Sequence, residues 1–223
     1  GANIYVHPNG AKHLIDPSKL LTSAERIYGE RMDSLWGPML PAPQDHVTMV
    51  EDGEEIQVEG MKITAIATPG HAHHHHAFRI EDVAFTGDAS GIRMPNSTFL
   101  TLPSPPPEFS LESWHRTLSK LQNAHFTTIF PTHYGGIENV REHLEELASH
   151  LSQCTEFIRN RLKKQMGRGE IIKEFVAWNR DRAIAAGLNE EAFQQYEKAN
   201  PFFMSVDGLM RYWSKKWETD ISS

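Results

Sequence analysis

The 223-residue chain contains very little cysteine and no long apolar stretch. Its one cysteine, Cys154, excludes a disulfide within the chain and a cysteine-rich zinc site. A lone cysteine also favours a reducing compartment, so we predict a cytoplasmic protein. A membrane-spanning helix needs about 18 or more consecutive apolar residues, and no such run is present. The sequence therefore predicts no membrane partner.

Basic residues are in the minority. The chain has 22 Lys and Arg against 29 Asp and Glu, which gives a net charge of −7 with histidine neutral. A nucleic-acid-binding surface needs clustered positive charge, because binding neutralises phosphates. The acidic balance therefore predicts no nucleic-acid partner. The chain is rich in histidine instead, with 13 copies, of which five lie in residues 71–76.

The apolar pattern changes along the chain. Residues 3–7 and much of 47–88 are short β-branched or aromatic runs separated by turn residues, which predicts strands. Residues 108–123 and the region after 139 have apolar residues three or four apart, which predicts helices. We expect a mixed α/β domain over residues 1–140 and a helical extension over residues 141–223.

The long helix predicted after residue 139 carries three side chains with testable positions. Cys154 falls on its apolar stripe, so we expect this thiol in the core. His143 and His150 lie one heptad apart on the same helix, and we expect both to be solvated. None of the three is expected to take part in chemistry.

Three predicted strands each end at a turn that presents one His or Asp. Residues 68–71 read Thr-Pro-Gly-His and end at His71, and residues 85–88 read Phe-Thr-Gly-Asp and end at Asp88. Residues 129–133 read Ile-Phe-Pro-Thr-His and end at His133. Each residue alone would more often be structural, and Asp88 could simply cap a helix. Together they predict a metal site on the rim of a sheet, because imidazole and carboxylate bind divalent ions well.

The histidine-rich stretch at residues 71–76 allows three interpretations: an affinity tag, a histidine-rich metal-binding segment, or one specific ligand with supporting neighbours. A tag would lie at a terminus and not between two strands. We favour His71 as the one ligand, because the preceding Pro-Gly fixes the corner between strand and loop. His73 and His75 then share one face of the following segment, and His74 and His76 the other.

In order and spacing, the three motifs resemble the third, fourth and fifth motifs of the metallo-β-lactamase superfamily of metal-dependent hydrolases. The resemblance covers roughly residues 3–140, and the helical tail looks like the C-terminal extension of glyoxalase II-like or lactonase-like members. It implies an αββα sandwich and one or two zinc ions, with iron or manganese as alternatives. His71 would bind the first metal and His133 the second, while Asp88 would bridge both and act in catalysis. The implied reaction is hydrolysis of an ester, thioester or lactone by metal-bound hydroxide.

One motif of that family has no match in this chain. The family's second motif, His-x-His-x-Asp-His, supplies two ligands to each metal and lies just before a helix and a strand like residues 3–7. We therefore expect that the chain starts just past it, and that the first strands of the sandwich are also absent. Each metal would keep about two ligands, so binding should be weak, and this form of the chain inactive, unless His73, His75 or a second chain contributed. Open sheet edges would also favour a homodimer.

Two further functions fit the same motifs, beside a hydrolase with a small-molecule substrate. A nuclease-type member of the superfamily would share the metal site, although the acidic charge argues against it. A catalytically silent interaction module would keep the histidines as remnants and dock a partner through the helical tail. A mixed α/β domain with an adventitious histidine cluster is the simplest alternative. The metal content of the purified chain separates the metal-dependent hypotheses from the others.

Overall fold

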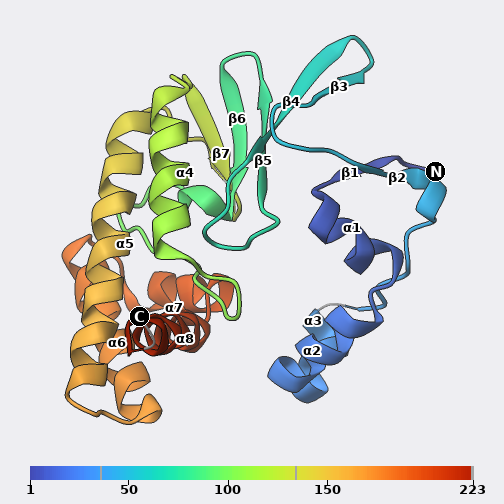
Figure 1. Cartoon of the computed structure of the whole chain (residues 1–223). Coiled ribbons are helices and arrows are strands. Elements are labelled where there is room, and N and C mark those ends of the chain that lie inside the picture. Colours follow the sequence, from blue (N-terminus) through green and yellow to red (C-terminus); the bar gives the residue numbers. More distant parts are fainter. Residues whose placement is uncertain (36, 134, 222–223) are drawn as a thin grey trace.

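The computed structural model describes residues 1–35, 37–133 and 135–221, so Tyr134, which follows the third motif, lies outside the described residues. Within these residues the chain has a mixed α/β fold, which confirms the predicted fold class. A five-stranded sheet forms the centre, helices cover one of its faces, and an N-terminal unit with its own small sheet lies on the other side (Figure 1).

The N-terminal unit pairs two short strands around three helices. Its elements are β1 (Ile4–Val6), α1 (Pro8–Ile15), α2 (Ser18–Tyr28), η1 (Gly29–Arg31), α3 (Met32–Leu35), η2 (Gln44–His46) and β2 (Val47–Met49). Strands β1 and β2 are parallel, with Ile4 opposite Val47. Helix α1 starts at Pro8, where the missing backbone N–H costs no hydrogen bond. The strand predicted at residues 3–7 is therefore present, and it pairs outside the main sheet.

The main sheet brings the ends of three strands to one edge. Its strands, in spatial order, are β3 (Glu55–Val58), β4 (Met61–Ala67), β5 (His76–Ile80), β6 (Val83–Gly87) and β7 (Thr128–Pro131). Neighbours are antiparallel except β6 and β7, which are parallel with Gly87 opposite Pro131. Strands β4, β6 and β7 therefore run in the same direction. Because parallel strands end at the same edge, the three predicted motifs meet there.

The two faces of this sheet are unequal. Ala84 and Ile129 point to the face covered by α4 (Leu111–Asn123) and α5 (Val140–Lys163), and both are fully buried. The alternate residues Phe85 and Phe130 point to the other face, where they remain 46% and 38% exposed. Their rings stack with centroids 5.3 Å apart. The sequence alternates in this way because successive strand residues face opposite sides.

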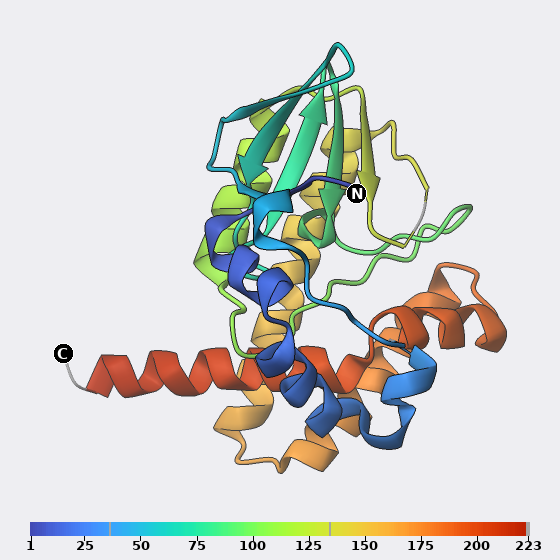
Figure 2. The ribbon, with the colours of Figure 1, turned by 90° about the vertical axis from the view of Figure 1, so that its right-hand side faces the viewer.

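The helical extension consists of the end of α5 followed by α6 (Arg168–Ala185), α7 (Glu190–Ala199) and α8 (Phe202–Ile221). Helix α8 lies below the sheet and crosses the lower part of the long α5 helix (Figure 2). One buried apolar cluster runs from Ile129 in the sheet through Leu144 to Val206 in α8. Cys154 lies inside this cluster, where we expected it. The boundary between residues 140 and 141 stays a prediction, but the two parts share a core.

The expectation that His143 and His150 are solvated was wrong, since they are 0% and 2% exposed. Helix α5 packs between α4 and the C-terminal helices, so positions beside its apolar stripe are also covered. The His143 Nε2–H group donates to Ser90 O at 2.7 Å, and His150 Nε2 lies 3.2 Å from an Arg182 nitrogen. Burial lowers the pKa of His143 to about 4 and that of His150 to about 3, so both rings are neutral at pH 7.

Candidate metal centre

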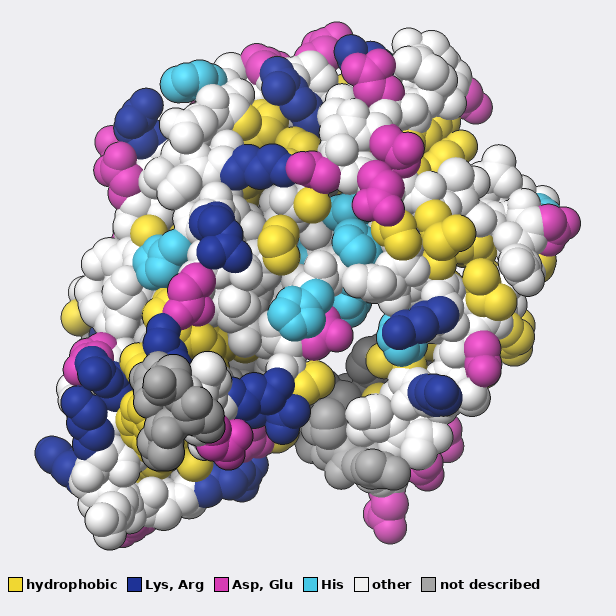
Figure 3. Space-filling view, viewed as in Figure 1, with side chains coloured by type: hydrophobic (Ala, Val, Ile, Leu, Met, Phe, Trp, Pro, Cys, Tyr) yellow, Lys and Arg dark blue, Asp and Glu magenta, His cyan; other side chains and the backbone are white. Residues whose placement is uncertain are grey.

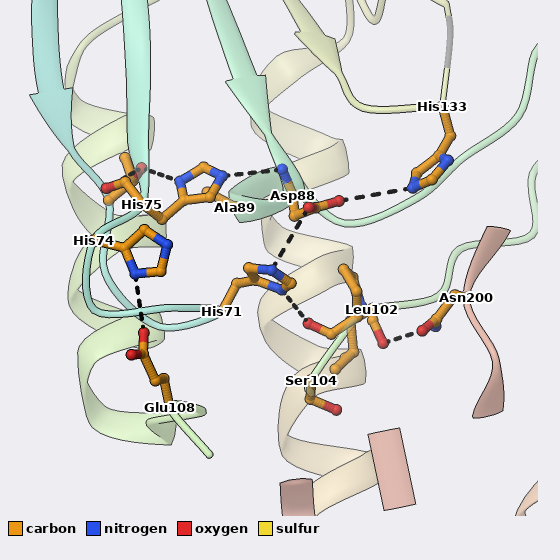
Figure 4. A network of polar contacts seen from close by, with 12 residues as sticks. His71, His74, His75, Asp88, Ala89, Leu102, Ser104, Glu108, His133 and Asn200 are labelled. Atoms are coloured by element: carbon orange, nitrogen blue, oxygen red, sulfur yellow. Dashed lines mark hydrogen bonds and ion pairs between the residues drawn. The ribbon is translucent and has the colours of Figure 1, made fainter. Parts of the chain in front are cut away.

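The three predicted site residues lie together at the common edge of β4, β6 and β7 (Figure 4). The Nε2 atom of His71 lies 3.6 Å from Oδ2 of Asp88, and the Nε2 atom of His133 lies 3.8 Å from Oδ1. The carboxylate thus stands between two imidazoles and offers one oxygen to each. Seen on the surface, histidines gather near the middle of one face, beside an opening next to the N-terminal unit (Figure 3).

The corner that presents His71 is fastened to helix α4. Gly70 has a φ of +147°, and a Cβ there would lie 2.5 Å from the Cα of Trp114. Two hydrogen bonds complete the contact, since Ser110 N–H donates to Gly70 O at 2.9 Å and Thr117 Oγ1 donates to Pro69 O at 2.7 Å. The Pro-Gly pair of the motif therefore allows the strand end to meet the helix backbone directly.

The His71 ring is held by a backbone carbonyl. Its Nδ1 atom lies 2.8 Å from Pro103 O, and because a carbonyl can only accept, the ring hydrogen is on Nδ1. The Nε2 atom then carries the lone pair and faces Asp88. The ring also meets Trp114 edge to face, with centroids 6.3 Å apart. His71 is therefore oriented in the tautomer that a metal ligand needs.

Asp88 follows a glycine that makes room for a third histidine. Gly87 has a φ of +54°, and a Cβ there would lie 2.6 Å from Nε2 of His75. Asp88 begins the short 3₁₀ helix η3 (Asp88–Ser90), and its backbone N–H donates to His75 Nε2 at 3.2 Å. No side-chain cap is formed at this helix, so the capping interpretation of Asp88 is wrong. The carboxylate is free to face the two imidazoles.

His75 is the functional residue that sequence reasoning left undecided. Its Nε2 accepts from Asp88 N–H, so the ring hydrogen is on Nδ1, which lies 2.6 Å from Thr68 Oγ1. Burial, and then the neighbouring His71, lower its pKa to about 4. Both ring nitrogens are occupied, so in this arrangement His75 positions the Asp88 backbone and is not a metal ligand. The alternation of residues 71–76 grouped His75 with His73 and did not say which pair faces the site; residues 71–75 form a turn, where strand alternation does not apply, and His73 is exposed.

The remaining histidines of the cluster face elsewhere. His73 is exposed, and its backbone N–H donates to Glu108 Oε2 at 2.9 Å. His74 Nδ1 lies 3.1 Å from the same oxygen. His76 packs against His7 with ring centroids 4.7 Å apart, and burial lowers its pKa to about 4. Of the five histidines in residues 71–76, His71 is the one that presents a free ring nitrogen to Asp88.

These residues fit the chemistry of a metal centre but do not complete one. The donor types suit zinc, and Oδ1 of Asp88 is buried without a hydrogen-bond partner. In the described part of the chain, however, no three His, Cys, Asp or Glu side chains are grouped so that they could hold one ion. Each imidazole reaches a different carboxylate oxygen, so each position has two donors. Catalytic zinc commonly takes about three protein ligands.

Comparison with known proteins gives a family context. Residues 1–133 match the family model of the metallo-beta-lactamase superfamily. A metallo-beta-lactamase fold-containing protein of Sulfurisphaera tokodaii is 29% identical over 133 residues, which cover 59% of this chain and 50% of the relative. An atrochrysone carboxyl ACP thioesterase of Aspergillus fumigatus is 29% identical over 142 residues, which cover 63% of this chain and 38% of the relative. The chain spans about half the length of the curated relatives that it matches first.

A solved structure shares the fold over nearly the whole chain. A metallo-beta-lactamase family protein from Thermus thermophilus superposes with a TM-score of 0.60 at 21% identity, covering 97% of this chain and 67% of that chain. The shared fold therefore includes the C-terminal helices. The family match contains His71, Asp88 and His133 and extends over more than half of the sequence. This chain belongs to the metallo-beta-lactamase superfamily, whose members bind metal ions and include hydrolases.

Proposed function

We propose that this chain carries part of a two-metal site in which His71 and His133 each bind one ion and Asp88 bridges them. The observation that carries the proposal is that the two oxygens of Asp88 face different imidazoles, at 3.6 Å and 3.8 Å. A carboxylate can bridge two cations by giving one oxygen to each, and this arrangement suits that mode. The whole protein is then a hydrolase that cleaves an ester, thioester or lactone.

Zinc is the metal that the donors suit best, as one or two ions, with iron or manganese as alternatives. When bound, such ions polarise a substrate oxygen and activate water. The chain itself orients the His71 ring through Pro103 O and holds the Asp88 backbone through His75. Two donors per position are too few for firm binding. The remaining ligands come from outside the described residues, either from another segment or from a second copy of this chain.

The proposed substrate class is supported by the net charge of the chain and by the name of one relative. The Aspergillus fumigatus protein is named a thioesterase, which supports a carbonyl substrate for this chain. The net charge of −7 supports a small molecule over a nucleic acid, and so a hydrolase of small esters over a nuclease. A catalytically silent interaction module remains the alternative from another class.

Two further properties belong to the same proposal. We propose a homodimer, supported by the exposed Phe85 and Phe130 pair on the open face of the sheet. A cytoplasmic location is supported by the single cysteine, Cys154, which is buried and unpaired. Among residues 1–35, 37–133 and 135–221, no helix has the length and apolar character needed to cross a membrane.

Titration of the untagged chain with Zn²⁺ in a calorimeter tests the metal site. We expect binding by the wild-type chain and a loss of affinity of at least about 100-fold in Asp88→Asn, since even outer-shell partners are worth 10–100-fold. The matched control is Asp82→Asn, because Asp82 is exposed and precedes the opposite end of the same strand, β6. Equal affinities in Asp88→Asn and Asp82→Asn would contradict the proposed metal site and favour the catalytically silent interaction module.

Hydrolysis assays separate the two enzyme hypotheses. The zinc-loaded chain is incubated with a small thioester, a lactone and a single-stranded RNA. We expect Asp88→Asn to abolish turnover of the thioester or lactone and Asp82→Asn to leave it unchanged. Cleavage of RNA that depends on Asp88 would overturn the substrate proposal in favour of the nuclease-type alternative.

A further inference from the structure

Residues 99–104 form a strap between the helical extension and the metal centre, and every residue of the strap is buried. Buried backbone groups need hydrogen-bond partners. Among the residues that the structure describes, the one strand-like pairing of the strap is the bridge between Thr101 and Ile92. Its carbonyl oxygens must therefore find other partners, and these partners determine how the strap is held.

The helical extension supplies most of these partners. Tyr196 Oη donates to Phe99 O at 3.0 Å, Arg182 Nη1 donates to Leu100 O at 3.3 Å, and Asn200 Nδ2 donates to Leu102 O at 3.0 Å. Thr101 O accepts from Ile92 N–H at 2.8 Å. Pro103 is the next residue, and its carbonyl instead accepts from the ring of His71 at 2.8 Å.

Ser205, near the start of α8, contacts the strap at two backbone groups. Its hydroxyl oxygen accepts from Ser104 N–H at 3.3 Å and lies 3.2 Å from both Leu102 O and Asn200 Oδ1, to which it can donate. Ser205 and Asn200 are only 1% and 4% exposed. Together they bind the backbone on both sides of Pro103 (Figure 4 shows Asn200, Leu102 and Ser104).

The hydrogen bonds on either side of Pro103 link the helical extension to His71. Asn200 and Ser205 hold Leu102 O and Ser104 N–H. The carbonyl between these two groups, Pro103 O, instead meets the His71 ring, so the backbone that carries it is held on both sides.

The sequence of α8 contains an independent sign of this contact. Gly208 lies inside the helix, although glycine weakens a helix relative to alanine. A Cβ at Gly208 would lie 1.9 Å from Ser104 O. Glycine at this position therefore allows α8 to lie directly against the strap.

We propose that Asn200 and Ser205 are positioning residues for His71: they hold the Leu102–Ser104 backbone, and Pro103 O then sets the ring orientation and tautomer of His71. The proposal deepens the function proposed above, because it assigns the helical extension a role in the same site. It does not require bound metal, since the hydrogen bond to Pro103 O is present in the chain alone.

The first test is nitrogen NMR of the histidine rings in the metal-free chain at pH 8, with the His71 signals assigned from the spectrum of His71→Ala. We expect the wild-type His71 ring to carry its hydrogen on Nδ1. In Ser205→Ala and in Asn200→Ala the signals should move toward a mixture of both tautomers. Ser205→Thr keeps the hydroxyl group, so its His71 signals should match those of the wild type.

The second test is zinc affinity in the same variants. We expect Ser205→Ala and Asn200→Ala to weaken Zn²⁺ binding about tenfold, the lower end for partners that orient a metal ligand. The matched control is Thr155→Val, because Thr155 is also buried in the extension but its hydroxyl bonds to Leu151 O of its own helix. Thr155→Val should leave both the His71 signals and zinc affinity unchanged.

The two tests keep this inference separate from the proposed function. A shift of the His71 signals in Ser205→Ala, with no zinc binding even by the wild type, would support the positioning role and refute the metal site. Zinc binding by the wild type, with His71 signals in Ser205→Ala and Asn200→Ala identical to those in Thr155→Val, would overturn the positioning role. Either variant that folds is sufficient for the comparison.

Discussion

The two histidines that face Asp88 are held very differently. His71 is 17% exposed, its ring nitrogen donates to Pro103 O, and its backbone corner is bound to α4. His133 is 30% exposed and has a φ of +69°, which is uncommon for a residue with a side chain. Within the described residues, the one recorded contact of its ring is with Asp88.

This difference predicts two unequal metal positions. A ligand that is already oriented loses little freedom when it binds an ion, so the position beside His71 should bind first. The position beside His133 depends on a loop and should bind more weakly. Substitutions on each side of Asp88, and a change of pH, test this inequality.

Gly70→Ala should have the largest effect, because it breaks the anchored side. The new Cβ would lie 2.5 Å from the Trp114 backbone, which cannot move aside, and the φ of +147° adds strain. We expect the free energy of unfolding to fall by about 3 kcal/mol or more in urea titrations. Gly60→Ala is the matched control, since Gly60 also has a positive φ, +84°, but has nothing within 4 Å. A loss no greater than that of Gly60→Ala, about 1 kcal/mol, would contradict the packing argument.

Removal of each imidazole should separate the two metal positions. We expect His71→Ala to weaken the tighter zinc-binding step about 100-fold and His133→Ala to weaken it less than about tenfold, because His71 is the preorganised ligand. Calorimetric titration of both variants measures the difference. Equal losses in the two variants would contradict the inequality between the two metal positions.

Acid should destabilise the packing of His143 against η3, the short helix that begins with Asp88. His143 Nε2–H donates to Ser90 O in η3, and its Nδ1 is buried without a partner. Because burial lowers its pKa from 6.5 to about 4, the unfolded chain takes up this proton more readily than the folded chain. Stability is therefore lost as pH falls from about 6.5 to about 4, with a slope of at most about 1.4 kcal/mol per pH unit from this group.

Urea titrations at a series of pH values measure this slope, and His143→Gln should reduce it. His150 and His75 also have lowered pKa values, so a smaller slope remains in the variant. His115→Gln is the control, since His115 is partly exposed on α4 and bonds to Ser152 at the surface. An unchanged slope in His143→Gln would show that protonation of His143 is not linked to unfolding.

The smallest effect should come from His73→Ala, which lies in the same loop as His71. His73 is exposed, and its recorded hydrogen bond uses the backbone N–H and not the ring. We expect zinc affinity to change less than about twofold, within the usual range of surface substitutions. A loss comparable to that of His71→Ala would mean that the loop rearranges to bind metal through His73.

Much of the fold could be predicted from local patterns. The strands β3 to β6 and the helices α4 and α5 follow alternating or helical spacing of apolar residues, which reports the environment of each short segment. The burial of His143 and His150 could not be predicted in this way. Whether the flank of a helix is covered depends on elements far away in sequence, here α4 and the C-terminal helices.

For the candidate site, local residue patterns were enough to identify the residues that end the strands: His71, Asp88 and His133 each follow an apolar run and a turn. The three-dimensional fold is needed to show that β4, β6 and β7 run in the same direction and that each Asp88 oxygen faces its own imidazole. The fold also shows that Thr68 and the Asp88 backbone bind both ring nitrogens of His75. It shows as well that the helical extension holds the backbone next to Pro103, whose carbonyl oxygen binds the His71 ring. These facts depend on strand direction and on contacts between segments up to about 100 residues apart, for which local residue patterns carry no signal.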